Sequence, residues 1–147
     1  MKKKTKRQTQ NEQQEVQWHP LSSLPLIAHL IDEGVADAEM QESLLEEGKE
    51  KPHVFDDEMI RRIKKVHTEK LEFIDIYLEQ MERWKKETLT MDEHFEIQRL
   101  SKECGRMKLL VMSILSLAEQ IGTKTIDKIL SMDDAELGLR FLLGEIK

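Results

Sequence analysis

One apolar stripe with a fixed repeat constrains this chain more than any other feature. Its members alternate spacings of three and four residues without a break: Ile97, Leu100, Cys104, Met107, Val111, Ile114, Ala118 and Ile121. The alternation averages about 3.5 residues, which is the repeat that keeps one face of a helix against a partner helix. The stripe therefore predicts a long helix with a helical neighbour.

The expected neighbour precedes this stripe and has the same spacings in mirrored order. Its members are Ile60, Lys64, His67, Leu71, Ile74, Leu78 and Met81. Pairing Met81 with Ile97 pairs each later residue in turn, so that Ile74 faces Cys104. This is the register of an antiparallel helical hairpin with a coiled-coil-like seam.

Capping residues set the ends of these helices. Thr90 with Glu93 three residues later is a capping-box pattern, and Gly122 follows the last seam residue. An earlier helix is expected to begin at Ser22 or Ser23, and a kink or break at Gly34 remains an open alternative.

The prediction is an all-α fold, a long antiparallel hairpin within a three- or four-helix bundle. Helices are expected at about 23–47, 57–87 and 91–121, with short helices within 124–143 that cover the end of the bundle.

The first 19 residues differ in composition from the rest. They hold five basic residues against Glu12 and Glu15, whereas the whole chain of 147 residues has a formal charge of −6. These residues include too few apolar side chains to offset the loss of conformational entropy on folding. We therefore expect residues 1–19 to form a disordered arm. Residues 20–147 have the length and apolar content of a single helical domain.

Residues that could carry out catalysis are sparse. Cys104 is the single cysteine and lies in the predicted seam, and the six glycines are scattered singly. The sequence shows no paired metal-ligating histidines and no phosphate-binding glycine loop. We therefore expect no enzymatic activity, cofactor or metal. His29 and Glu33, four residues apart, keep a metal-binding bundle open as a second alternative.

Three further features of the two predicted helices leave alternatives open. Phe73, Tyr77 and Trp84 share one side of a predicted helix, which suits either a partner interface or the core. His67 lies in the seam, either at its edge in contact with solvent or as a pH-sensitive point in the core. Residues 107–121 are apolar nearly all round, and the first helix, the C-terminal segment or a second copy must cover them.

The leading hypothesis is a non-enzymatic protein–protein interaction or assembly module, an adaptor or regulatory bundle that self-associates as a homodimer or larger oligomer. The alternative is a nucleic-acid-associated regulatory protein whose arm contacts phosphates. The contacting residues would be Lys2, Lys3, Lys4, Lys6 and Arg7. The longest apolar run, Leu109 to Ala118, is about half of a membrane span, so we expect a cytoplasmic protein with no span.

Overall fold

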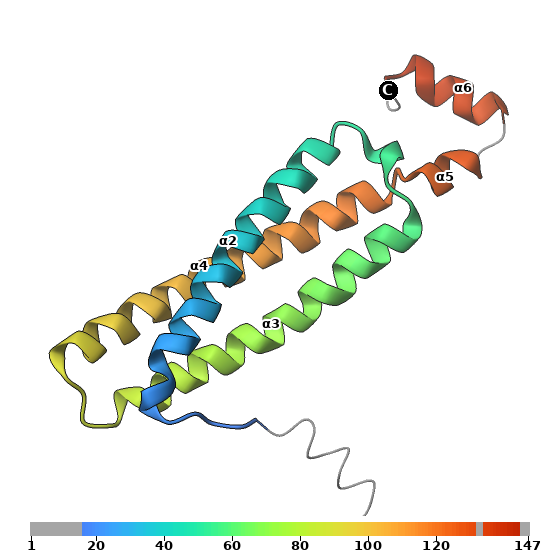
Figure 1. Ribbon diagram of the computed structural model, residues 1–147. Coiled ribbons are helices and arrows are strands. Elements are labelled where there is room, and N and C mark those ends of the chain that lie inside the picture. Colours follow the sequence, from blue (N-terminus) through green and yellow to red (C-terminus); the bar gives the residue numbers. More distant parts are fainter. Residues whose placement is uncertain (1–15, 132–133, 145–147) are drawn as a thin grey trace, which may run out of the picture.

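The computed structural model describes residues 16–131 and 134–144, and all regular structure in these ranges is helical (Figure 1). The three long helices are α2 (Leu24–Gly48), α3 (Asp57–Lys85) and α4 (Met91–Gly122). Two short helices follow, α5 (Ile126–Leu130) and α6 (Asp134–Leu142), and the short 3-10 helices are η1 (Leu21–Ser23) and η2 (Pro52–Val54). The all-α helical bundle predicted from the sequence is confirmed.

Helix α4 is the centre of the bundle, because both α2 and α3 pack against it (Figure 1). α3 runs antiparallel to α4, as predicted, whereas α2 runs parallel to it. Two ion pairs show the parallel arrangement. Asp32 pairs with Arg99, and Glu39 pairs with Arg106 seven residues further along both helices. The whole predicted seam of α4 is buried in the core that these three helices share.

The hairpin register differs from the predicted one by about one helical turn. The predicted pairing sets Ile60 against Ala118, but a Cβ built on Gly122 would lie 3.2 Å from Ile60 Cγ2. Likewise, Lys108 Nζ donates to Asp75 Oδ1 at 3.2 Å, although the predicted register sets Lys108 level with Lys70. Because the apolar residues recur every three or four positions, a helix can shift by one such repeat along its partner and still bring apolar residues together. The pattern therefore determines the buried face but not the register.

The helix ends follow their local chemistry with one exception. The Glu93 N–H donates to Thr90 Oγ1 at 3.1 Å and the Thr90 N–H donates to Glu93 Oε1 at 2.9 Å, which confirms the capping box. Ser23 makes no side-chain capping bond, because η1 precedes α2 and leads the backbone into it. α2 passes unbroken through Gly34, where a Cβ would lie 2.8 Å from Met107 Sδ. The absence of a side chain at Gly34 thus leaves room for the end of the Met107 side chain.

The C-terminal segment is attached to the start of α3 by polar contacts. Thr125 Oγ1 and Lys128 Nζ donate to Asp57 Oδ1 at 2.6 and 2.9 Å, and these two donors lower the pKa of Asp57. The prediction that the apolar residues beyond α4 cover the end of the bundle is wrong for Leu130, Phe141 and Leu142, which are 74%, 61% and 85% exposed. The segment ends in α6, which projects away from the three long helices (Figure 1).

By length and composition alone, Met91–Leu130 contains a stretch apolar enough to cross a membrane, contrary to the expectation from the longest apolar run. One third of that stretch is buried inside the structure. A central helix that packs against two neighbours needs apolar side chains on two sides, so its composition also fits a core helix.

Candidate partner-binding groove

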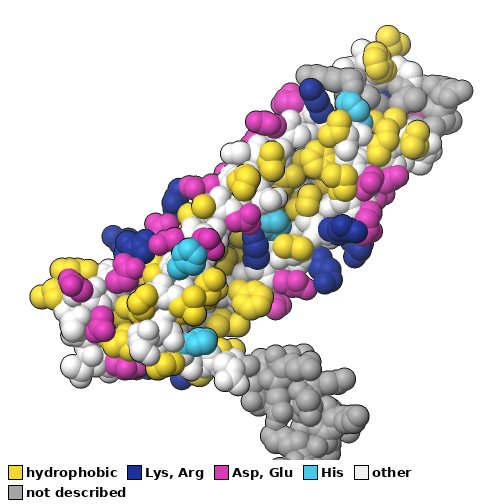
Figure 2. Space-filling view, in the orientation of Figure 1, with side chains coloured by type: hydrophobic (Ala, Val, Ile, Leu, Met, Phe, Trp, Pro, Cys, Tyr) yellow, Lys and Arg dark blue, Asp and Glu magenta, His cyan; other side chains and the backbone are white. Residues whose placement is uncertain are grey.

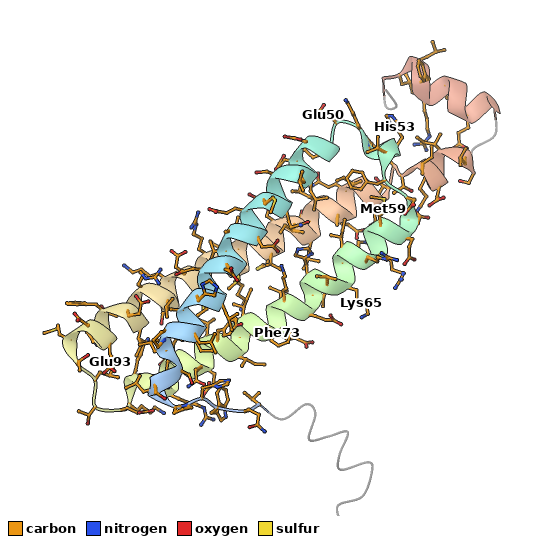
Figure 3. All side chains as sticks on the ribbon, viewed as in Figure 1. Glu50, His53, Met59, Lys65, Phe73 and Glu93 are labelled. Atoms are coloured by element: carbon orange, nitrogen blue, oxygen red, sulfur yellow. The ribbon has the colours of Figure 1, made fainter. Side chains whose placement is uncertain are left out.

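A cavity of about 720 Å³ lies between α2 and α3, and we call it the α2–α3 groove. Figure 2 shows hydrophobic side chains along the line between these two helices, and Figure 3 labels Phe73 on α3 at the edge of the groove. The residues that line it are Val16, Gln17, His19, Ile27, Leu30, Glu72, Phe73, Ile76, Tyr77 and Gln80. Half of these are large aliphatic or aromatic side chains of α2 and α3.

The groove exists because α2 and α3 pack on α4 much more than on each other. A polar bridge crosses between the two helices, where Lys70 Nζ donates to Asp37 Oδ2 at 2.7 Å. Three helices that share one central member leave an open side between the outer two. A fourth helix would cover that side in a four-helix bundle.

Residues 16–20 form a strap that closes one end of the groove. The His19 N–H donates to Gln80 Oε1 at 2.8 Å, while Gln80 Nε2 and Trp84 Nε1 donate to the His19 carbonyl at 3.3 and 3.0 Å. The predicted disordered arm is therefore wrong for residues 16–19, because the buried amide and indole groups of α3 need these hydrogen-bond partners. Residues 1–15 lie outside the described residues.

The three aromatic residues singled out in the sequence do not share one surface. Phe73 is 59% exposed and Tyr77 is half-buried, and both line the groove. Trp84 is fully buried in the core, so it is not accessible to a partner. Burial raises the pKa of Tyr77. Of the interface prediction, Phe73 and Tyr77 remain candidates.

Sequence reasoning missed the strap and Ile76. The strap bonds join residues 61 and 65 positions apart, and no local pattern signals such a distant partner. A polar residue between the apolar positions of α3, such as Gln80, carries no mark that it will be buried. The predicted phosphate-contacting residues Lys2, Lys3, Lys4, Lys6 and Arg7 lie outside the described residues, and their role stays a prediction.

His67 lies deep in the bundle at 3% exposure, so the interpretation as a seam-edge residue in contact with solvent is wrong. Its Nδ1 lies 2.9 Å from the Ile63 carbonyl, which assigns the proton to Nδ1 in the neutral ring. Nε2 is buried and meets no hydrogen-bond partner among the described residues. Burial lowers the pKa of His67, opposed by the Ile63 carbonyl, while Lys70 and Asp37 act in opposite directions.

The remaining reactive groups offer little for chemistry. Burial raises the pKa of Cys104 to about 12, so its thiol stays protonated at neutral pH. His29 and Glu33 pair at 3.2 Å on an exposed face. Among the described residues, no group of three His, Cys, Asp or Glu side chains is placed to hold a metal ion.

Apolar side chains are also exposed on the far side of α4 from its two neighbours. Leu109 is 70% exposed and Met112 is 51% exposed. The sequence predicts cover on every side of residues 107–121, and the described residues do not supply it here.

Comparison with known proteins finds no matching family model, no significantly similar curated protein and no significantly similar solved structure.

Proposed function

We propose that this chain is a non-enzymatic protein–protein interaction module that associates with itself. The observation that carries the proposal is the α2–α3 groove, where the exposed side chains of Leu30 and Phe73 flank a cavity of about 720 Å³. Apolar side chains grouped beside a cavity are typical of binding sites, whereas single exposed apolar residues are common on any surface.

The chemistry of the groove favours an apolar protein segment over a small polar ligand. The Gln80 amide is already bonded to the backbone of His19, and Glu72 is the one Asp, Glu, Lys or Arg among the lining residues. The walls are two helices, and an apolar groove between helices suits an amphipathic helix. The exposed Leu109 and Met112 form a separate apolar area on the other side of α4.

Sedimentation of the full chain at several concentrations tests this proposal. We expect the mean mass to rise above the 17.3 kDa of one chain between about 1 and about 100 µM, the range of a moderate interface. The substitution Phe73→Asp should weaken the association at least about tenfold, because it places a charge in an apolar contact.

Phe95→Asp is the matched control, since Phe95 lies outside the groove and is exposed to almost the same extent, 58% against 59%. A chain that stays monomeric over the whole concentration range would contradict self-association.

A further inference from the structure

We infer that two copies of this chain pair through the exposed face of α3, with the two α3 helices antiparallel and related by a two-fold axis close to Val66. This inference rests on the proposed function and names the surface through which the chain associates with itself. It follows from three observations, which concern an apolar stripe on α3, a row of charges beside that stripe, and the unpaired charge of Glu72 in the α2–α3 groove.

The first observation is a stripe of exposed apolar side chains that recurs every seven residues along α3 (Figure 3). Met59 is 43% exposed, Val66 is 47% exposed and Phe73 is 59% exposed. Residues seven apart lie two turns apart on the same face of a helix. The residues of α3 that pack on α4 lie on another face and are buried, so this stripe is a second apolar face that the described residues leave uncovered.

The second observation is a row of four exposed charged residues beside this stripe. Arg62, Lys65, Glu69 and Glu72 follow one another at spacings of three, four and three residues, so they share one flank of α3. The two basic residues come first and the two acidic residues follow. Read backwards, the row has the opposite sign at every position. It is therefore complementary to itself in an antiparallel pair of helices.

The charged row lies on the flank of the stripe that points away from α2. Lys70 marks the other flank, because its Nζ donates to Asp37 of α2 at 2.7 Å. With about 3.6 residues per turn, Lys70 and the charged row fall on opposite sides of Val66. A second helix can therefore contact both the apolar stripe and the charged row without displacing α2.

The third observation is that Glu72 has no positively charged neighbour in its own chain. The other acidic residues of α3 all form ion pairs, and they are Asp57, Glu58, Glu69, Asp75, Glu79 and Glu82. Glu72 forms no ion pair with a described residue, and it lines the α2–α3 groove. The other wall of the groove is α2, which contains no Lys or Arg. The groove therefore attracts a positively charged segment.

An antiparallel pair of α3 helices agrees with the spacing of the apolar stripe. Val66 is the middle residue of the stripe, so a two-fold axis beside it places Val66 against Val66 of the second copy. Met59 of each copy then meets Phe73 of the other at the edge of the groove. The contact is made twice, and the assembly closes as a dimer instead of growing into a filament.

The same axis brings opposite charges together. Arg62 lies within about 3 Å, along the helix axis, of the level of Glu72 of the second copy, and Lys65 is equally close to the level of Glu69. Within one chain, Lys65 pairs with Glu69 and Arg62 pairs with Glu58. These are exposed pairs within one helix and add little to stability, so their exchange for pairs between copies costs little.

Charge reversal and its complementation test the inference. Arg62→Glu and Glu72→Lys each put like charges together at both ends of the proposed contact, and both residues are exposed, so the fold should persist. We expect each variant alone to associate at least about fivefold more weakly than the unmodified chain in sedimentation at low ionic strength. An equimolar mixture should associate within about twofold of the unmodified chain, because every pair in the mixed dimer again joins opposite charges.

A third variant tests the apolar stripe. Val66→Asp brings two carboxylates together at the axis and should weaken the association at least about tenfold. Glu47→Lys is the control for charge, since Glu47 is an exposed acidic residue of α2 that forms no ion pair with a described residue. It should associate like the unmodified chain, and circular dichroism checks the helical content of every variant.

Normal association of Val66→Asp and Glu72→Lys beside a defective Phe73→Asp would overturn this inference and leave the proposed function standing, since the groove would then bind another segment of the second copy. A mixture that associates no better than its two components would also overturn it. Equal weakening by Glu47→Lys and Glu72→Lys would do the same, because net charge alone would explain it. A monomeric unmodified chain would contradict both proposals.

Discussion

The bundle of α2, α3 and α4 and the C-terminal segment of α5 and α6 are held in place by different physical effects. In the bundle, side chains such as Ile31, Val111 and Ile114 are fully buried, and each contributes about 1.5–3 kcal/mol by leaving water. The C-terminal segment is held by polar contacts around Asp57, namely a hydrogen bond from the buried Thr125 hydroxyl and an exposed ion pair with Lys128. Exposed ion pairs add little to stability.

This difference shows that apolar composition alone does not produce burial. Residues 139–143 hold three leucines among five residues, a larger share than in any of the three long helices, yet Leu139 and Leu142 remain exposed. The helix that carries them projects away from the three long helices (Figure 1). A weakly attached apolar helix can instead bind a second molecule without disturbing the fold of the first.

The largest expected effect contrasts a buried charge in the bundle with the same charge on α6. Val111→Asp should lower the free energy of unfolding by more than about 4 kcal/mol, because the carboxylate has no partner in an apolar core. Leu139→Asp should change it by less than about 0.5 kcal/mol. Urea unfolding followed by circular dichroism at low concentration measures both, and equal midpoints would refute the comparison.

A second experiment sharpens the register within the bundle. Leu78→Cys, one turn beyond Ile74, should form a disulfide with Cys104 and raise stability by about 3 kcal/mol. Ile74→Cys should not, because it is offset by about 6 Å along the helix axis. Oxidation should take place during refolding from urea, since burial raises the pKa of Cys104 to about 12 and makes the native thiol unreactive. A bond at residue 74 alone would restore the register expected from the sequence.

The third prediction concerns pH and applies to the bundle but not to α6. Burial lowers the pKa of His67, so the unfolded chain binds the proton first as the pH falls. Stability is therefore complete above the unfolded pKa, near 6.5, and decreases below it by at most about 1.4 kcal/mol per pH unit. His67→Leu should reduce the difference between urea midpoints at pH 7.5 and 5.5. An unchanged difference would show that His67 is not the responsible group.

The smallest expected effect comes from two glycines that both have open space around them. Gly105→Ala in α4 should stabilise the bundle by about 0.5–1 kcal/mol, because a Cβ there meets nothing within 4 Å and alanine favours the helix. Gly138→Ala has the same open surroundings in α6. It should leave the unfolding midpoint of the bundle unchanged, and an equal gain at both sites would mean that α6 unfolds together with the bundle.

Sequence reasoning identified the parts of the fold that depend on local chemistry. The capping box at Thr90 and the regular seam of α4 are encoded within a few residues, so the ends and buried face of that helix could be predicted. The parallel placement of α2 involves contacts between residues far apart in the sequence, such as the ion pairs of Asp32 with Arg99 and Glu39 with Arg106, and spacing does not reveal them.

The candidate site was harder to predict than the fold, because a groove forms where helices do not meet. Phe73 and Tyr77 could be proposed as interface residues from their type and spacing. Trp84 could not be separated from them, because its burial depends on the strap and the carbonyl of His19.

The bonds of the strap determine where this chain can be shortened without harm. A protease cut ahead of Val16 would leave Gln80 and Trp84 with their acceptor, and the resulting fragment should keep one wall of the groove. A cut after Pro20 would remove that acceptor and open the tryptophan to water. The first turn of α2 is therefore a poor starting point for a minimal version of the protein.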